Sequence, residues 1–364
     1  MNKEVLSDRQ KIFLVSLFLI GETAIYVLGS SAKQDAWLAI LLAILIALIM
    51  ALIYGRLHYL FPEKDLFDMI EILFGKFIGR GLVLLFVVFT FEYVAQELTY
   101  LSEYISIMGL PQTPKIAPAI CSILLCIWLV KAGIEVIGRC AQLFLPFIIV
   151  LIFVTILLLI PDMNVNHLSP VLYNGITPVL EGSFSAFVSP FGEIIIFTII
   201  FSSFKTKKSP YKIYIFPLLI AGITLVTIST ANLLVLGVDI SSMIYFPSHF
   251  TVSIINIGNT IQRMEIVAAI VFIIGGIIKA SIMLLATSKG LSKIFRFADY
   301  RFIVTAIALL AVNLFSFQFE SSMEAYEFYF EAYPYLAVLL QTLFPITIWI
   351  FAEVRNKRSK ASFH

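Results

Sequence analysis

Charged side chains are scarce in this sequence. Of its 364 residues, 13% are Asp, Glu, Lys or Arg, whereas 60% are hydrophobic. A soluble domain carries about 25% charged residues, and a chain this apolar lacks the polar surface that water requires. The composition therefore excludes an ordinary soluble globular protein and predicts a bilayer as the solvent. A formal net charge of +2 also gives no basic surface for nucleic acid.

Residues typical of metal sites and enzyme active sites are few. The three cysteines form no CxxC pair, and we interpret them as buried apolar side chains of helices: Cys121, Cys126 and Cys140. The four histidines are scattered along the chain: His58, His167, His249 and His364. No Walker loop, HExxH, GxSxG or EF-hand pattern occurs. We therefore expect no metal, no cofactor and no enzyme activity.

Long apolar runs fill the rest of the chain. A helix needs about 20 apolar residues to cross a bilayer, and the first run has no small-residue cleavage site after it, so it is a span and not a removed signal peptide. No loop is long enough for a second domain, and we expect one transmembrane domain over residues 1–364. The ten predicted spans lie near 10–30, 35–60, 80–107, 114–131, 140–161, 182–204, 212–236, 265–288, 300–319 and 333–353.

Lysine and arginine indicate the orientation of these spans. With the N-terminus inside, 21 of the 25 basic residues fall in cytoplasmic segments. Only Lys33, Lys115 and Arg263 fall in outer loops, and Lys279 lies within a span. Basic loops stay on the cytoplasmic side of a membrane. The sequence therefore predicts an even number of spans with both termini in the cytoplasm.

Five ionisable residues stand where lipid is expected. Each costs about 2.5–3.5 kcal/mol at the centre of a bilayer, so such groups face a cavity or the interior of a helix bundle. One interpretation is a structural salt bridge between the lysine and one glutamate. We favour function for the set, because one lysine cannot neutralise four carboxylates. The five residues are Glu22, Glu92, Glu97, Glu193 and Lys279.

The predicted span 80–107 has two adjacent polar faces at helical spacing. A helix with so broad a polar arc lines a pocket or meets a partner. One face consists of Glu92, Gln96, Thr99 and Glu103. The other consists of Tyr93, Glu97, Tyr100 and Tyr104.

Two spans carry a Gly-Glu pair near their middle, namely Gly21-Glu22 and Gly192-Glu193. Pro190 removes a backbone donor and disfavours helical geometry at the residue before it. The two spans are five apart and so cross in opposite directions. Breaks at matching positions indicate an inverted repeat with a binding site at the midplane, with halves near 10–161 and 182–353. Two unrelated kinks are the alternative.

Three segments resemble one known family over essentially the whole chain. They are Gly29-Ser-Ser-Ala-Lys-Gln-Asp-Ala-Trp-Leu38, Phe61-Pro-Glu-Lys-Asp-Leu-Phe67 and Ser189-Pro-Phe-Gly-Glu193. With the ten-span hydropathy, they are similar to the spore germination permease family, the B subunit of nutrient germinant receptors of Bacilli. That family is related to the amino acid–polyamine–organocation transporters.

The resemblance implies a fold and a function. The fold is an all-α integral membrane protein of ten transmembrane helices, with a five-plus-five inverted repeat of the LeuT type and breaks in helices 1 and 6. The function is to bind a small nutrient germinant, often an amino acid, beside an A subunit and a lipoprotein C subunit in the inner spore membrane.

The sequence departs from its relatives in the first span. They carry a Gly-small-Gly stretch there, whereas Glu22 follows Gly21 here. In the transporter plan the half-helix N-terminus at this place holds a substrate carboxylate, and a glutamate competes for those amides. Our hypothesis is that Glu22 caps the half-helix or meets an ammonium or hydroxyl group of the ligand.

A receptor subunit with a midplane pocket is thus the favoured interpretation. A proton-coupled transporter of amino acids or related small solutes is the alternative, and a purely structural scaffold is a third. Lys279 is the expected counter-charge. The candidate ligand-binding residues are Gly21, Glu22, Thr23, Tyr26, Glu97, Tyr100, Ser189, Pro190, Phe191, Gly192, Glu193 and Lys279.

Overall fold

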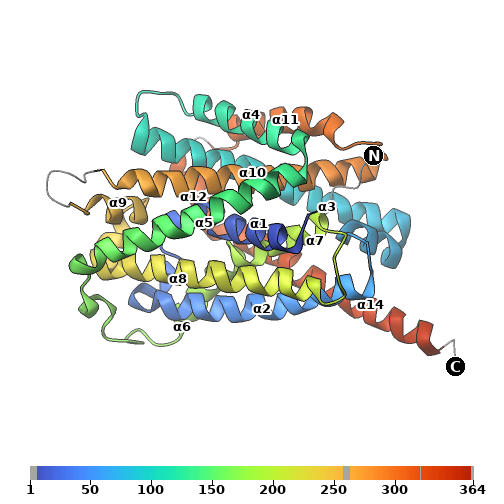
Figure 1. The fold of residues 1–364 in the computed structure, drawn as a ribbon, viewed down its shortest axis with the longest axis horizontal. Coiled ribbons are helices and arrows are strands. Elements are labelled where there is room, and N and C mark those ends of the chain that lie inside the picture. The colour runs from blue at the N-terminus through green and yellow to red at the C-terminus, as the bar shows by residue number, and fades with distance from the viewer. Residues whose placement is uncertain (1–5, 257–262, 320, 362–364) are drawn as a thin grey trace.

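The structure is a computed structural model that describes residues 6–256, 263–319 and 321–361 (Figure 1). Within these ranges it is helical and has no strand. The α-helices are α1 (Asp8–Ile20), α2 (Ala36–Leu60), α3 (Leu66–Tyr104), α4 (Ile116–Ala132), α5 (Ile134–Leu159), α6 (Thr177–Val188), α7 (Ile196–Ile200), α8 (Ser209–Met243), α9 (Pro247–Ser253), α10 (Glu265–Phe295), α11 (Arg301–Phe317), α12 (Ser322–Glu327), α13 (Tyr333–Val338) and α14 (Phe344–Ala361).

Seven helical segments among the described residues are long and apolar enough to cross a membrane. They are Ser30–Leu60, Leu66–Gly109, Ile134–Asp162, Thr177–Ile200, Ser209–Met243, Glu265–Phe295 and Tyr333–Lys357. Two shorter apolar helices, Ile116–Ala132 and Val304–Phe317, lie among them. The chain is therefore a multi-pass membrane protein, as its composition predicts.

Helix α1 has a defined beginning and an early end. At its start Ser7 and Gln10 form a capping box, in which the Ser7 hydroxyl accepts from the Gln10 amide at 3.2 Å. At its end the backbone of Gly21 turns out of helical geometry, with φ 4° and ψ −124°. A short 3-10 helix, Glu22–Ile25, follows. The chain thus leaves the α-helix directly before the first intramembrane glutamate.

Helix α6 ends at Val188, two residues before Pro190. Ser189 is extended, with φ −137° and ψ 118°, as expected for a residue that precedes proline. A 3-10 helix, Phe191–Ile195, then leads into α7. Glu193 lies in this 3-10 segment, so both Gly-Glu pairs stand where the helical hydrogen-bond pattern changes.

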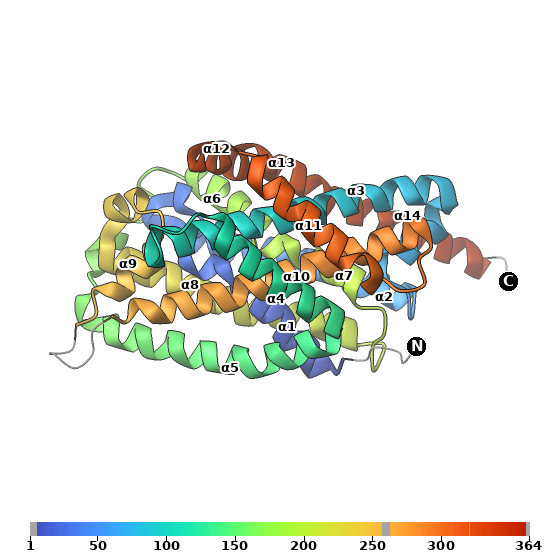
Figure 2. The same cartoon turned by 90° about the horizontal axis from the view of Figure 1, so that it is seen from above.

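The helices pack into a bundle around the segments that carry these changes. Helix α10 lies along α3 and also contacts the 3-10 helix Glu22–Ile25. Helix α1 packs between α8 and α5, while α2 packs on α8 and α6 (Figures 1 and 2). Residues far apart in the sequence therefore meet at the centre of the bundle.

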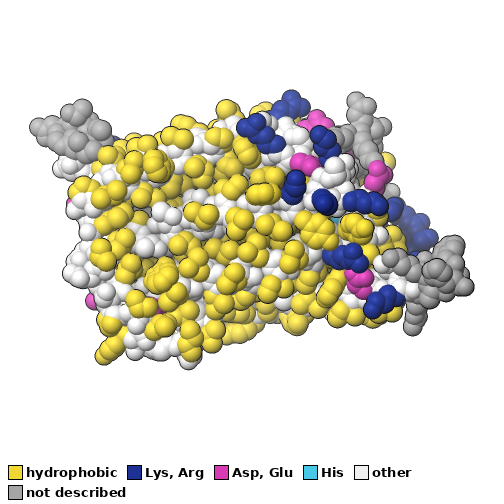
Figure 3. Space-filling view, turned by 60° about the horizontal axis from the view of Figure 1, so that its bottom comes forward, with side chains coloured by type: hydrophobic (Ala, Val, Ile, Leu, Met, Phe, Trp, Pro, Cys, Tyr) yellow, Lys and Arg dark blue, Asp and Glu magenta, His cyan; other side chains and the backbone are white. Residues whose placement is uncertain are grey.

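The surface separates by charge along the long axis. Hydrophobic side chains cover most of the face in Figure 3, whereas Lys and Arg gather at one end. The beginning of α1 and the end of α14 lie at that same end (Figures 1 and 2), and α9 lies at the opposite end. This distribution is typical of a membrane protein whose basic end faces the cytoplasm.

Two regions differ from the sequence-based expectation. The stretch between the predicted spans 300–319 and 333–353 is helical in its described part, in α12 and the π-helix Phe328–Ala332; Glu320 lies outside the described residues. The helix that contains the third predicted span, near 80–107, begins before that span. Helix α3 starts at Leu66 and changes direction at Gly75, where φ is 78°. Aromatic residues give the 320–331 segment an apolar side, although its acidic residues make it look like a loop in the sequence.

Candidate functional site

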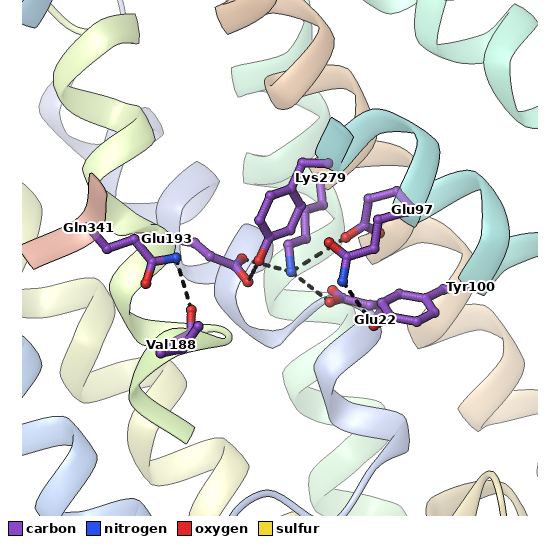
Figure 4. A network of polar contacts seen from close by, with 9 residues as sticks. Glu22, Glu97, Tyr100, Val188, Glu193, Lys279 and Gln341 are labelled. Carbon is purple, nitrogen blue, oxygen red and sulfur yellow. Dashed lines mark hydrogen bonds and ion pairs between the residues drawn. The ribbon is translucent and has the colours of Figure 1, made fainter. Parts of the chain in front are cut away.

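Lys279 of α10 lies at the centre of a buried cluster of carboxylates. Its Nζ is 2.6 Å from Glu22 Oε1, 2.7 Å from Glu193 Oε2 and 3.5 Å from Glu97 Oε1. In Figure 4 Lys279 points between Glu193 on one side and Glu22 and Glu97 on the other. The four side chains come from four segments, the two 3-10 helices, α3 and α10. We call these four residues the Lys279 cluster.

The cluster is shielded from solvent. Lys279, Glu97 and Glu193 have no exposed surface, and Glu22 has 3%. Tyr93 adds a hydrogen bond from its hydroxyl to Glu193 Oε1. The Lys279 ammonium also lies 5.5 Å from the ring centroids of Phe18 and Tyr93. Phe18 in turn packs edge-on against Phe197 at 5.0 Å.

The formal charges of the Lys279 cluster do not balance. Three ionised carboxylates and one ammonium would leave two negative charges in a dry interior. Each unpaired ion costs several kcal/mol there, and no further Lys, Arg or His is paired with these carboxylates among the described residues. In formal charges, the single ammonium of the cluster therefore balances only one of its three carboxylates.

A cavity of about 300 Å³ adjoins the Lys279 cluster. This volume is at the lower end of the roughly 300–1,000 Å³ that small-molecule sites occupy. Glu22 and Tyr93 belong to its lining, so the cavity touches the cluster directly. The remaining lining residues are Thr23, Tyr26, Val27, Leu28, Gly29, Ser30, Ser31, Gln96, Tyr100, Ser185, Ala186, Val188, Ser189, Tyr329, Tyr333 and Pro334.

The cavity continues toward the end of the molecule that carries α9. A second hollow shares Tyr26, Val27, Ser30 and Ser31 with it and reaches the end of α8 and the start of α9. The cavity does not extend to the basic end. There Lys11 of α1 donates to the carbonyl oxygen of Ser203, and the cavity lining includes no residue of that region.

The structure distributes the candidate residues over three environments. Lining the cavity are Glu22, Thr23, Tyr26, Tyr100 and Ser189. Behind it, in the Lys279 cluster, are Glu97, Glu193 and Lys279.

The other four candidates, Gly21, Pro190, Phe191 and Gly192, lie outside the cavity lining and are buried in packing contacts.

Two of these glycines allow close packing. A Cβ atom on Gly275 of α10 would lie 2.1 Å from the Cα of Gly21. A Cβ on Gly192 would lie 2.4 Å from Oε1 of Gln341. Glycine therefore lets the backbone of α10 approach one non-helical stretch and the side chain of Gln341 approach the other.

Gln341 is a contact that sequence reasoning missed. Its side-chain amide donates to the carbonyl oxygen of Val188 at 3.1 Å, and its backbone carbonyl oxygen accepts from the Tyr54 hydroxyl at 2.8 Å. Val188 is the last residue of α6, whose carbonyl lacks a helical partner. The signal in the sequence was a lone glutamine within an apolar span. The sequence does not show which group this glutamine contacts.

Tyr329 and Tyr333 were also missed as cavity residues. In the sequence Tyr329 falls between two predicted spans and Tyr333 begins the last one, whereas in the fold the ring of Tyr329 packs against that of Tyr100 at 5.6 Å. The two other acidic residues on the polar faces predicted for span 80–107 bind elsewhere. Glu92 accepts from the amide of Gln318 at 3.1 Å, and Glu103 pairs with Lys115 at 3.1 Å.

Solved structures with the same arrangement of helices are transporters. The chain superposes on Mhp1, a nucleobase-cation-symport-1 family transporter solved with bromovinylhydantoin, with a TM-score of 0.65 at 14% identity, over 91% of this chain and 77% of that one. It superposes on MhsT, solved with L-phenylalanine, with a TM-score of 0.63 at 13% identity, over 96% and 99%. The fold is therefore that of the LeuT-type membrane transporters.

Sequence comparisons place the chain more narrowly within that class. Residues 5–324 match the family model described as spore germination protein, and the chain belongs to this family. It is 27% identical to spore germination protein KB of Bacillus subtilis over 372 residues, which is 100% of this chain and 98% of the relative. It is 22% identical to spore germination protein XB of Bacillus anthracis over 283 residues, which is 75% and 78%.

Proposed function

We propose that this chain is the germinant-binding B subunit of a spore germinant receptor. A small nutrient, by resemblance an amino acid, binds in the cavity beside the Lys279 cluster. The single observation that carries the proposal is that this cavity ends on a buried ionisable cluster built from both non-helical stretches. A group bound there contacts Glu22 directly and Glu193 through Lys279, so it acts on both stretches together.

The proposed architecture has ten spans in two inverted halves, near 10–161 and 182–353, with the first and sixth spans interrupted. Both termini face the cytoplasm, and the membrane is the inner membrane of the spore. The helix ends at Ile20 and Val188 and the fold of the transporter neighbours support this arrangement.

Signalling follows from unequal affinity for two states. A ligand shifts a conformational equilibrium only if it binds one state more tightly than the other. The Lys279 cluster connects four segments, and one added or removed partner of Glu22 changes the charge balance of all of them. We propose that the resulting rearrangement passes to an A subunit and a lipoprotein C subunit and begins germination.

A germination panel tests this function. Spores whose only receptor contains this subunit are exposed to amino acids, sugars and nucleosides, and germination is followed by loss of optical density. We expect a response to at least one compound, and we expect Glu193→Gln to lower the sensitivity to it by about tenfold or more, because a buried charge contact is removed. Glu181→Gln, on an exposed position of α6, is the matched control. A Glu193→Gln subunit that responds as the wild type to every compound contradicts the proposed site.

Proton-coupled transport is the second candidate function. The transporter fold and the unbalanced charge of the Lys279 cluster favour it, because a cluster that takes up a proton can couple proton and solute movement. Uptake of labelled amino acids into liposomes that contain the isolated chain discriminates between the two. Accumulation driven by a pH gradient favours transport, and saturable binding without accumulation favours the receptor.

A further inference from the structure

Tyrosine is prominent among the residues that line the cavity. Five tyrosines belong to its lining, and their rings contact one another in sequence around it. Neighbouring ring centroids are 6.2 Å apart for Tyr26 and Tyr100, 5.6 Å for Tyr100 and Tyr329, 6.1 Å for Tyr329 and Tyr333, and 5.6 Å for Tyr333 and Tyr93. We call these five residues the tyrosine wall. They come from the stretch after α1, from α3, from the π-helix Phe328–Ala332 and from the start of α13.

The charge of the cavity has one sign. Its lining contains Glu22 but no lysine, arginine or histidine. The nearest ammonium, that of Lys279, is fully buried and already held by three carboxylates. A ligand anion would therefore meet a carboxylate and no cationic side chain. A ligand cation would meet a carboxylate and several electron-rich ring faces.

Glu22 has an oxygen available for such a cation. Its Oε1 accepts from Lys279 at 2.6 Å, whereas its Oε2 is buried and has no hydrogen-bond partner. The side chain is buried, with 4% of it exposed, and it lines the cavity. A buried carboxylate oxygen without a donor is costly. A donor from the ligand would satisfy it.

We infer that this site recognises its ligand through an ammonium group, which sits against the tyrosine wall and donates to Glu22 Oε2. Aromatic cages around one carboxylate are a common way to bind organic ammonium ions, because the ring faces carry negative potential. The inference rests on the proposed binding function and specifies the chemistry of the ligand. It also decides between the two roles considered for Glu22 in favour of ligand contact.

Matched compounds test the inference on the wild-type chain. The full chain in nanodiscs is titrated with L-alanine, L-alaninamide, L-lactate and D-glucose, and with the corresponding leucine series, L-leucine, L-leucinamide and 2-hydroxyisocaproate. Binding is measured by calorimetry. The amides keep the ammonium group and lose the carboxylate, and the hydroxy acids do the reverse. We expect each amide to bind within about threefold of its amino acid, and each hydroxy acid at least about tenfold more weakly.

Variants locate the ammonium group. Glu22→Gln and Tyr329→Leu are each expected to weaken amide binding, by about tenfold and about fivefold respectively. Tyr335→Leu is the control, because Tyr335 is an exposed tyrosine of the same region outside the cavity lining. Thermal unfolding of each variant shows that it is folded before it is titrated.

The outcomes separate the inference from the function on which it rests. If the hydroxy acids or glucose bind as tightly as the amines, the ammonium inference is wrong while a nutrient site remains. If Glu22→Gln and Tyr329→Leu keep the wild-type affinity for the amides, the inference is also overturned. If no compound of any class binds the wild-type chain, the proposed function itself fails.

Discussion

Lys279 is the residue on which the charge balance of the site depends. It is fully buried and contacts three carboxylates from three other segments. Buried ion pairs contribute little net stability when intact, but the loss of one partner leaves the others uncompensated. The functional and the structural interpretation of this lysine are therefore compatible, because the charge that organises the site also holds its segments together.

The first prediction concerns this charge. Lys279→Met is expected to lower the free energy of unfolding by about 3–5 kcal/mol, because three buried carboxylates lose their only cation. Unfolding in detergent micelles, followed by tryptophan fluorescence, measures the effect. Lys33→Met, at an exposed position, is the control.

Combining Lys279→Met with Glu22→Gln and Glu193→Gln should restore much of the loss, since the two substitutions remove negative charge. A Lys279→Met chain as stable as the wild type would show that the carboxylates are already neutral without the lysine.

At the scale of elements, helix α10 is positioned by a contact between glycines. It crosses the stretch between α1 and the 3-10 helix Glu22–Ile25 at Gly21 and Gly275. The close approach places Lys279, one helical turn further along α10, within reach of Glu22. Small residues serve this purpose at helix contacts in membranes because they let backbones approach.

The second prediction follows from that contact. Gly275→Ala places a Cβ 2.1 Å from the Cα of Gly21, so α10 must shift, at a cost of about 1–3 kcal/mol for overpacking. Gly81→Ala in α3 is the control, because no atom lies within 4 Å of the added Cβ and alanine favours the helix. Thermal unfolding compares the two variants. Equal stabilities would contradict the close approach of α10 to the break.

At the scale of the whole molecule, two features define a direction. They are the basic residues gathered at one end (Figure 3) and the course of the cavity. The cavity opens toward the α9 end, away from the basic end where α1 starts and α14 finishes. In the proposed orientation, with the basic loops in the cytoplasm, this opening faces the outer side of the membrane. That direction suits a receptor for nutrients that arrive from outside.

The third prediction tests this direction in intact cells that express a chain without its three cysteines. Ser31→Cys, exposed at the mouth of the cavity, should react with a membrane-impermeant maleimide added outside. Lys207→Cys, exposed between α7 and α8, should react only after permeabilisation. The opposite pattern would overturn the orientation. A compound that binds the cavity should slow the reaction at Ser31→Cys.

Sequence alone predicted the multi-pass membrane character, the family and the list of intramembrane charges. These depend on local properties, because a run of apolar residues is long enough to span a bilayer wherever its neighbours lie. It also indicated that Gly21-Glu22 and Gly192-Glu193 belong together, since glycine and proline interrupt helices in any context.

The tertiary structure decided which groups meet. Lys279 and Glu22 are 257 positions apart. The sequence alone does not show that Lys279 contacts Glu22 and not Glu92. The tyrosine wall depends on Tyr329 and Tyr333, whose rings meet those of Tyr100 and Tyr93 of α3 only in the folded bundle. Contacts between distant segments arise from packing of the whole bundle. The ligand chemistry can therefore be inferred only from the residues that line the folded cavity.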